Sequence, residues 1–248
     1  MAEQAPDLKI RTSVKFDGSI WRQYETSTHL FVLTSLGRHL LRERHMYKDF
    51  VRYTDDYMND RQGNEDFRSY LAEGANGKVY TLGDDFVVKE SRLLTQLAPA
   101  DSLLAALNRM DQLVDAVQKN CPSWIDVPAH YGIAVSKADT RKQFMLMQKI
   151  DHGVTVGDII LADESRISHG ILTSEAFNKF GPITPELRTE VNDRYELLKY
   201  LVKTAIIKER LNPDVYLPDI DYNPHNVVIE KLATPIAGSQ IKYSVIDQ

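Results

Sequence analysis

A short segment from Asp221 to Ile229 constrains the fold of this chain more than any other feature. It reads Asp-Tyr-Asn-Pro-His-Asn-Val-Val-Ile, so that an acid and an amide lie five residues apart in a loop that leads directly into an apolar run. A carboxylate can accept or orient a hydroxyl proton, and an amide oxygen is a hard, neutral ligand that suits Mg²⁺. Asp221 and Asn226 are therefore candidate chemical residues at the entrance to a buried strand.

A third polar residue, Asp247, closes the next apolar run, at residues 243–246. It could supply the anionic ligand of a metal ion. Each of these three residues also has an ordinary interpretation, as a turn-forming Asp, an Asx-turn Asn and a strand-end Asp. Their joint occurrence in this order favours a functional site.

Two glycines and a lysine lie well upstream. Gly74 and Gly77 fall between two predicted strands, and glycine lets a backbone approach phosphate oxygens without a β-carbon in the way. An ordinary hairpin that happens to contain two glycines is the competing interpretation. Lys89 follows one hairpin later, at the end of the apolar strand 86–90, where a partly buried ammonium needs an anionic partner. Reaching solvent from a strand end is the commoner fate of lysine.

Composition narrows the class of protein. The chain has 248 residues, of which 43% are apolar, and a net charge of 30 − 35 = −5, which gives no sign of a broad nucleic-acid surface. The single cysteine, Cys121, excludes an intrachain disulfide and favours a reducing compartment. No apolar run reaches the roughly 18 residues that a membrane span requires. The polar N-terminus lacks the apolar stretch of a secretory signal, so we expect a cytoplasmic protein of unknown oligomeric state.

Residues before 67 are expected to form a partly helical extension. Residues 1–25 are polar and predicted to be loosely ordered, whereas residues 27–58 carry apolar positions at helical spacing. Three histidines in this part, His29, His39 and His45, do not share one helical face, so surface histidines are favoured over a metal cluster. The apolar stripe of the extension must be buried against the rest of the protein.

The remaining pattern is three strands, one helix and two strands, then mainly helices and a hairpin. Strands are predicted at residues 67–71, 78–82, 86–90, 131–135 and 143–148, helices from Asp101 and at 156–162 and 186–211, and a hairpin at 227–230 and 241–246. The first five strands and their helix predict a small antiparallel sheet with one packed helix.

Taken in order, these motifs resemble those of the protein-kinase-like superfamily over about residues 67–248. Gly74, Gly77 and Val79 match the family's Gly-x-x-Gly-x-Val, Lys89 its strand lysine, Asp221 and Asn226 its Asp-x-x-x-x-Asn, and Asp247 the Asp of Asp-Phe-Gly. Residues 145–150 resemble the hinge between the lobes, with Met147 at the gatekeeper place and main-chain groups of Gln148 to Ile150 against adenine. The resemblance implies ATP and Mg²⁺ as cofactors, with Asn226 and Asp247 as the metal ligands.

The departures from the family are informative too. Ala72 replaces the first loop glycine, and Asp219 and Ile220 replace the usual His-Arg. The helix from Asp101 contains no Glu, so the family's ion pair with Lys89 would need Asp111 or Asp115, of which Asp111 has the better spacing. Only Gln248 follows Asp247, an ending that resembles the minimal kinases, without an activation segment, that some bacterial pathogens deliver into host cells.

The fold implied by the resemblance is α+β and two-lobed. It comprises the extension at 1–66, an N-lobe at 67–148 with a small antiparallel sheet plus helix, and a reduced, mainly helical C-lobe at 149–248. The implied function is phosphoryl transfer from ATP to a Ser or Thr hydroxyl of a protein substrate, a host protein included.

Three alternatives remain open at this point. A small-molecule phosphotransferase of the aminoglycoside kind has a similar Asp-x-x-x-x-Asn loop, although such enzymes usually carry a helical substrate subdomain after the metal acid. A pseudokinase, which binds a partner without turnover, is favoured by the missing ion-pair Glu and Phe-Gly and opposed by the retained Lys89, Asp221, Asn226 and Asp247. A kinase relative that transfers a nucleotidyl group is the third.

Overall fold

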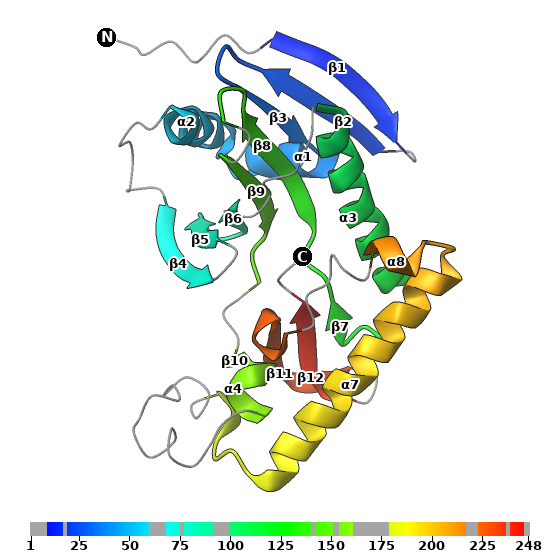
Figure 1. Ribbon diagram of the computed structural model, residues 1–248. Coiled ribbons are helices and arrows are strands. Elements are labelled where there is room, and N and C mark those ends of the chain that lie inside the picture. The colour runs from blue at the N-terminus through cyan, green and yellow to red at the C-terminus, as the bar shows by residue number, and fades with distance from the viewer. Residues whose placement is uncertain are drawn as a thin grey trace. The chain divides into compact units, whose positions relative to one another are not determined.

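The computed structural model divides the chain into two compact units. It describes residues 9–16, 19–59, 68–74, 77–91, 100–139, 142–150, 154–160, 179–216, 223–236 and 239–245. The first unit comprises residues 1–111 and 129–149, and the second comprises residues 112–128 and 150–248. Figure 1 labels their elements.

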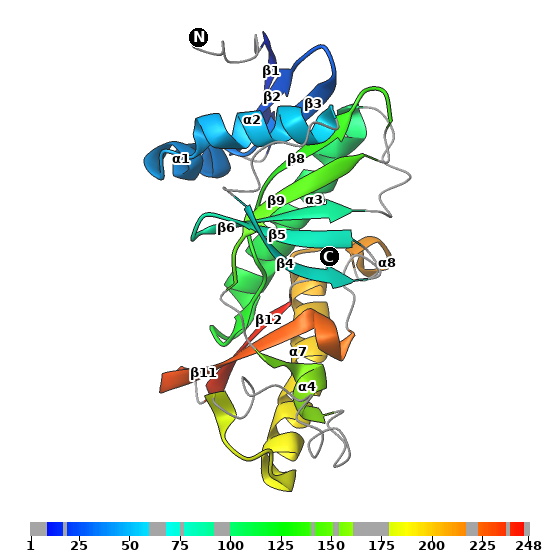
Figure 2. The same ribbon diagram turned by 90° about the vertical axis from the view of Figure 1, so that its left-hand side faces the viewer.

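The first unit is built on one eight-stranded antiparallel sheet. Its strands are β1 (Lys9–Phe16), β2 (Ser19–Glu25), β3 (His29–Leu33), β4 (Arg68–Gly74), β5 (Gly77–Leu82), β6 (Phe86–Ser91), β8 (His130–Ser136) and β9 (Gln143–Gln148). They lie in the order β1-β2-β3-β8-β9-β6-β5-β4, part of which is seen in Figure 2. Every neighbouring pair is antiparallel.

The five-strand part of this sheet confirms the predicted pattern. Strands β4, β5 and β6 form a meander, helix α3 (Ala100–Asn120) follows, and β8 and β9 complete the set with β9 hydrogen-bonded to β6. The α+β class is therefore confirmed. The tight turn between β5 and β6 contains Gly83 at φ 63°, in the left-handed region where glycine pays no steric cost.

The N-terminal part differs from the sequence-based expectation. Residues 9–25, expected to be loosely ordered, form β1 and β2, and the start of the predicted helix at 27–58 is the strand β3. Because β3 pairs with β2 on one side and β8 on the other, and contains the strand-favouring Phe31 and Val32, sheet pairing prevails over the helical spacing. The rest of the predicted helix forms α1 (Ser35–Glu43) and α2 (Tyr47–Met58).

The break before α1 has a local cause. Thr34 is the N-cap of this helix, and its side chain accepts a hydrogen bond from the Gly37 N–H at 2.8 Å. Such a cap satisfies a helical N–H that has no partner inside the helix. The Gly37 backbone lies against Tyr131 of β8, so close that a β-carbon would come within 2.6 Å of the Tyr131 Cβ.

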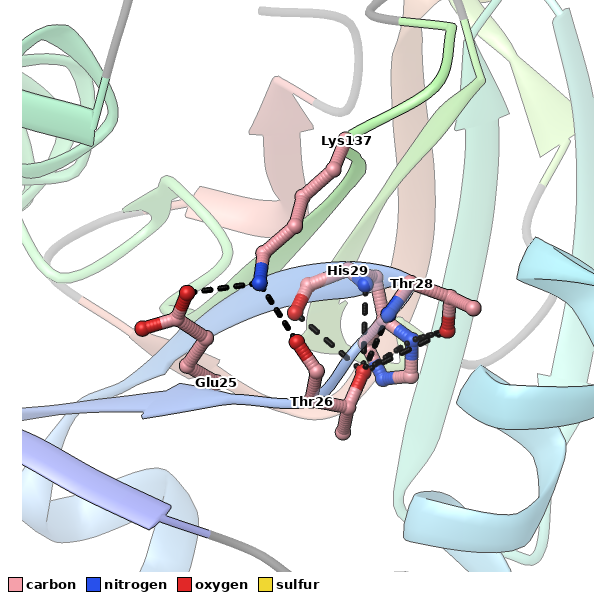
Figure 3. Close-up of polar contacts among 5 residues, drawn as sticks. All are labelled: Glu25, Thr26, Thr28, His29 and Lys137. Atoms are coloured by element: carbon pink, nitrogen blue, oxygen red, sulfur yellow. Dashed lines mark hydrogen bonds and ion pairs between the residues drawn. The ribbon is translucent and has the colours of Figure 1, made fainter.

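The turn between β2 and β3 is held by a polar network around His29 (Figure 3). The His29 Nδ1 lies 3.0 Å from the hydroxyls of both Thr26 and Thr28. The Lys137 ammonium donates to Glu25 Oε1 at 2.6 Å and to the Thr26 carbonyl at 2.5 Å. His29 is fully buried, and burial lowers its pKa to about 4.

The surface position expected for three histidines is therefore wrong for His29. It lies on β3 in the same alternation as Phe31, with which its ring stacks at 6.0 Å. His39 and His45 are exposed, as expected. The described residues contain no group of three or more His, Cys, Asp or Glu side chains that could hold a metal ion.

Helices α1 and α2 of the extension pack on one face of the sheet, which confirms the predicted burial of its apolar stripe. A cluster of buried side chains, here called the aromatic core, joins α1 and α2 to the strands. Its members are Tyr24, Phe31, Leu33, Leu41, Phe50, Val51, Tyr53, Met58, Leu82, Phe86, Val88, Tyr131, Ala134, Phe144 and Leu146. The rings of Phe50, Tyr53 and Tyr57 all contact Phe144 of β9, at centroid distances of 5.3–6.0 Å.

The second unit combines a four-stranded sheet with helices. Its elements are β7 (Ile125–Asp126), β10 (Val154–Thr155), α4 (Val156–Ile160), α7 (Pro185–Lys208), α8 (Pro213–Tyr216), the 3₁₀ helix η2 (Pro224–Asn226), β11 (Val227–Ile236) and β12 (Ser239–Val245). The sheet order is β10-β11-β12-β7. The predicted hairpin at 227–230 and 241–246 is present as β11 and β12, and its last predicted residue, 246, lies outside the described residues.

Helix α7 buries the face that its sequence predicts. Thr184 caps its start, where the hydroxyl accepts from the Leu187 N–H at 3.2 Å, and Pro185 follows as the first helical residue. The buried residues of the helix are Val191, Tyr195, Leu198, Val202, Ala205 and Ile206. Most of them pack with β11, β12 and Trp124 in the core of this unit.

Candidate functional site

Lys89 lies on the face of the large sheet opposite the aromatic core. Its neighbour Val88 belongs to that core, and its other neighbour, Glu90, accepts a hydrogen bond from the Tyr53 hydroxyl of α2 at 2.7 Å. Because successive side chains of a strand point to opposite faces, Lys89 points away from α2. Its ladder partners are Val79 on β5 and Met145 on β9.

This second face, here called the Lys89 face, carries a small apolar cluster. Val87, Met145 and Met147 are buried together there, with Val79 and Met110 packed against them. The structure thus brings three of the predicted site residues, Val79, Lys89 and Met147, to one face of one sheet. Methionines are flexible side chains that adapt to irregular partners.

The glycine loop is the end of the hairpin formed by β4 and β5. Gly74 and Gly77 are ladder partners at that end, and residues 75–76 between them lie outside the described residues. Lys89 is two ladder positions away from this hairpin end, since Gly77 pairs with Ser91 of β6 and Val79 with Lys89. The predicted proximity of loop and lysine along the sheet follows from this register.

A buried histidine, His130, lies on the Lys89 face and had no role in the sequence interpretation. It is the ladder partner of Met147, while its neighbours Ala129 and Tyr131 pack in the aromatic core. Neither of its ring nitrogens has a hydrogen-bond partner among the described residues. Burial, and then the positive charge of Lys89, lower the pKa of His130 to about 3. The sequence did offer a signal for this residue, because His130 is a polar residue at a position of an apolar strand that points into the interior.

The predicted hinge segment is partly occupied by hydrogen bonds within the first unit. The Gln148 N–H donates to the Ala129 carbonyl at 2.8 Å, and the Lys149 N–H donates to the Asp85 carbonyl at 2.9 Å. The predicted adenine contact of residues 148–150 stays a prediction, and the N–H groups of Gln148 and Lys149 already have acceptors within the chain. Asp111, proposed to pair with Lys89, is a half-buried residue of α3 that directly follows Met110. Its pairing with Lys89 stays a prediction.

In the second unit, Asn226 occupies the last position of a capped turn. The Asn223 side-chain oxygen accepts from the His225 N–H at 3.0 Å, and the Asn223 carbonyl accepts from the Asn226 N–H at 2.8 Å. Pro224 is the first residue of η2 and needs no N–H partner there. Asn226 is half-buried and directly precedes Val227, which pairs with Val245 of β12.

Two of the predicted chemical residues, Asp221 and Asp247, lie outside the described residues. Lys89 belongs to the first unit and Asn226 to the second, and the structure fixes the surroundings of each within its own unit. The role of Asn223 as the N-cap of η2 was missed by sequence reasoning. An Asn followed by Pro is a usable signal for such a turn.

No helix in the described part of the chain has the length and apolarity needed to cross a membrane. No protein-family model matches the chain. No curated protein sequence matches it either.

Several solved structures resemble the chain. One is the GDP and kanamycin complex of APH(2'')-IIIa, at 14% identity and a TM-score of 0.33, covering 79% of this chain and 72% of that chain. A second is the streptomycin–ATP–APH(2'')-IIa ternary complex, at 15% identity and a TM-score of 0.29, covering 79% and 69%. A third is the ADP-bound aminoglycoside phosphotransferase APH(2'')-Ib, at 17% identity and a TM-score of 0.26, covering 79% and 69%.

These neighbours have a protein-kinase-like fold, the architecture that the sequence motifs predict. Their names describe aminoglycoside phosphotransferases bound to nucleotides, and none of the three mentions a protein substrate. Because each TM-score is below 0.5 and each identity below 25%, we infer neither activity nor substrate from these likenesses.

Proposed function

We propose that the chain is a phosphotransferase that uses ATP and Mg²⁺ to phosphorylate a hydroxyl group. The observation that supports this most is the placement of Lys89. It lies on a sheet face with an apolar cluster of Val79, Val87, Met145 and Met147, two ladder positions from a hairpin end made of two glycines. A purine ring needs apolar walls, and its phosphates need a cation and open backbone N–H groups nearby.

Each residue of the first unit has a defined task in this proposal. Val79 and Met147 flank the base. Main-chain groups near Ile150, where the second unit begins again after Lys149, contact its edge. Gly74 and Gly77 let the backbone approach the phosphates, and Lys89 neutralises charge that builds up during transfer. Asp111 orients the Lys89 ammonium. Phosphoryl transfer requires mainly positioning and charge stabilisation, so few groups need to take part covalently.

The second unit supplies the groups for the acceptor and the metal. Asp221 orients the acceptor hydroxyl and takes its proton. Asn226 and Asp247 offer an amide oxygen and a carboxylate, a donor set that fits Mg²⁺, and Asn226 is presented on a capped turn. When bound, the ion neutralises charge on the transferring phosphate. The turn at Asn223 and the strand β11 hold Asn226 in place for this task.

Two classes of acceptor fit these residues. The first is the hydroxyl of a small molecule, the alternative that the Asp-x-x-x-x-Asn loop leaves open. The Ser or Thr hydroxyl of a protein, which the kinase motifs predict, is second. Both acceptors react through the same Lys89, Asp221, Asn226 and Asp247.

The test is ADP release and intact-mass measurement after incubation with ATP and Mg²⁺. The purified protein is incubated alone, with a panel of aminoglycosides and other polyhydroxylated molecules, and with a cell lysate. We expect ADP release and a mass gain of one phosphate on an acceptor, both lost in Lys89→Met and Asp247→Asn. Mass gain of a nucleotide would redirect the proposal to nucleotidyl transfer. ATP binding without any product would contradict it in favour of a pseudokinase.

A further inference from the structure

The start of helix α4 forms a reciprocal cap in which one hydroxyl has a fixed orientation. Asp158 Oδ2 accepts from the Thr155 N–H at 2.8 Å and from the Thr155 hydroxyl at 2.7 Å, while Thr155 Oγ1 accepts from the Asp158 N–H at 3.1 Å. This is the arrangement of a capping box. Because the single hydroxyl proton of Thr155 is directed to the carboxylate, its oxygen can only accept from any further partner.

That further partner is the ring of His225, the residue before Asn226. The His225 Nδ1 lies 3.4 Å from Thr155 Oγ1. Since Thr155 must accept here, Nδ1 is the donor and carries a proton. This contact joins two segments 70 residues apart in the sequence.

The same ring lies directly against the backbone of Gly157. A β-carbon at Gly157 would come within 2.4 Å of both Cε1 and Nδ1 of His225, and such an approach is not possible without displacement. Gly157 is buried, whereas the His225 ring is a movable group at the surface. A side chain at Gly157 would therefore displace the ring and leave the helix in place. Glycine at this position leaves space for the ring.

We propose that His225 is a positioning residue whose ring, seated on Gly157 and Thr155, fixes the turn that presents Asn226. The N–H of His225 is held by Asn223, and its ring contacts Thr155 of β10 and lies against Gly157 of α4, so the residue next to Asn226 is restrained at both its backbone and its side chain. This inference rests on the proposed function in assigning Asn226 to Mg²⁺. It assigns His225 no proton transfer.

The first test measures ADP release from ATP at rising Mg²⁺ concentration. Groups that orient a metal ligand typically change metal affinity by about 10- to 100-fold when they are removed. We expect His225→Ala and Gly157→Ala each to raise the Mg²⁺ concentration for half-maximal rate by at least about 10-fold. The double variant should be no worse than His225→Ala, because both changes remove one contact. Unchanged Mg²⁺ dependence, or additive losses in the double variant, would overturn the proposal.

Two conservative replacements provide matched controls. The amide nitrogen of Asn can take the place of Nδ1, whereas that of Gln reaches toward the place of Nε2. His225→Asn should therefore restore most of the Mg²⁺ affinity and His225→Gln should not. If His225 were instead a general base, catalysis would require its titratable ring, and neither Asn nor Gln at this position would restore the rate. Equal loss in both variants, with a changed pH profile of the rate, would overturn the positioning role.

The second test needs no activity. We expect a nuclear Overhauser contact between the His225 Hε1 and the Gly157 Hα protons in the wild-type chain. The side-chain amide signal of Asn226 should shift in His225→Ala and Gly157→Ala and stay in place in His225→Asn. Absence of the contact, or an Asn226 signal indifferent to all three changes, would overturn the inference. If these signals behave as expected in a protein without ADP release, the inference holds and the proposed function fails.

Discussion

The two faces of the large sheet in the first unit carry different types of side chain. The aromatic core on one face contains rings of Phe31, Phe50, Tyr53 and Phe144 in edge-to-face and tilted contact, and it fastens α1 and α2 to the strands. The Lys89 face carries valines, methionines and a lysine. Rigid rings specify one packing arrangement, whereas methionines adapt to what is placed against them.

Each face also buries one histidine, and the contrast between the two is instructive. His29 on the aromatic side has its Nδ1 held by two threonine hydroxyls, while its Nε2 has no partner among the described residues. His130 on the Lys89 face has neither ring nitrogen paired among the described residues. A buried polar atom without a partner costs stability, so both faces carry such a cost and the larger one lies at His130. We propose that the aromatic core holds the fold and that the Lys89 face serves a ligand.

The largest expected effect on stability comes from comparing two neighbouring residues of β9 that lie on opposite faces of the sheet. Phe144→Ala should lower the free energy of unfolding by about 3–5 kcal/mol, because three aromatic rings contact this side chain. Its neighbour on the other face, Met145, should accept Leu at a cost below about 1.5 kcal/mol. Urea unfolding of both variants measures the two costs. Equal costs would show that the faces do not differ in this way.

Catalytic activity should depend on the Lys89 face, whereas stability depends mainly on the aromatic core. Lys89→Met should reduce the rate of ADP release by at least about 100-fold, because it removes a charge that acts in the transition state. The adjacent Glu90 points to α2, so Glu90→Gln should keep the rate of the wild-type chain. Both rates are measured at saturating ATP and Mg²⁺. A full rate in Lys89→Met, with normal melting temperature, would remove Lys89 from the site.

Acid should destabilise the fold through both buried histidines. The folded-state pKa is about 4 for His29 and about 3 for His130, against 6.5 when unfolded, so the unfolded chain binds more protons below pH 6.5. Stability therefore falls as pH drops from 6.5, by up to roughly 1 kcal/mol per pH unit for each histidine. The negative charge of Asp55 raises the pKa of His29 and so weakens this pH dependence. The positive charges of Lys137 at His29 and of Lys89 at His130 lower the pKa values and so strengthen it.

The measurement is the free energy of unfolding at pH 7 and pH 5. His130→Leu should flatten this dependence and His29→Asn should flatten it separately, because the two residues lie on opposite faces. At pH 7 the leucine should cost little, since it removes an unpaired buried group. A pH dependence that survives both substitutions would place its origin elsewhere.

The smallest effect concerns the hydrogen bond that fastens α2 to β6. Tyr53→Phe removes the 2.7 Å contact with Glu90 and keeps the ring in the aromatic core, so about 1 kcal/mol of unfolding free energy should be lost. Tyr57→Phe is the matched control, because its contact with the Gln143 carbonyl is 3.5 Å long. Thermal unfolding of the two variants compares them. A larger loss in Tyr57→Phe would contradict the assignment.

Sequence periodicity predicted the elements that are amphipathic over many residues. The buried face of α7 is the one expected from its spacing, and the strands that flank Gly83 were found from their turn. Strand β3 was mistaken for helix because five apolar-rich residues carry too little periodic information. Its pairing with β2 and β8 decides its conformation, and that pairing joins distant parts of the chain.

The residues of the candidate site also divide into those that local sequence predicted and those that only the fold reveals. Lys89 and Asn226 were found because they belong to local motifs with fixed spacing. His130 and the seat of His225 on Gly157 were not, because each depends on which strand or helix lies opposite. A glycine that makes room for a ring 68 residues away leaves no local signature in the sequence.

The central claim is that the Lys89 face binds the nucleotide, and its methionines allow a direct test. The chain has six methionines, among them Met145 and Met147 on the Lys89 face and Met58 in the aromatic core. With the methyl groups labelled with ¹³C and assigned through single Met→Leu variants, ATP and Mg²⁺ are titrated into the full chain. We predict saturable shifts of the Met145 and Met147 signals and an unchanged Met58 signal. Shifts confined to Met58, or no shift at millimolar ATP, would contradict the claim.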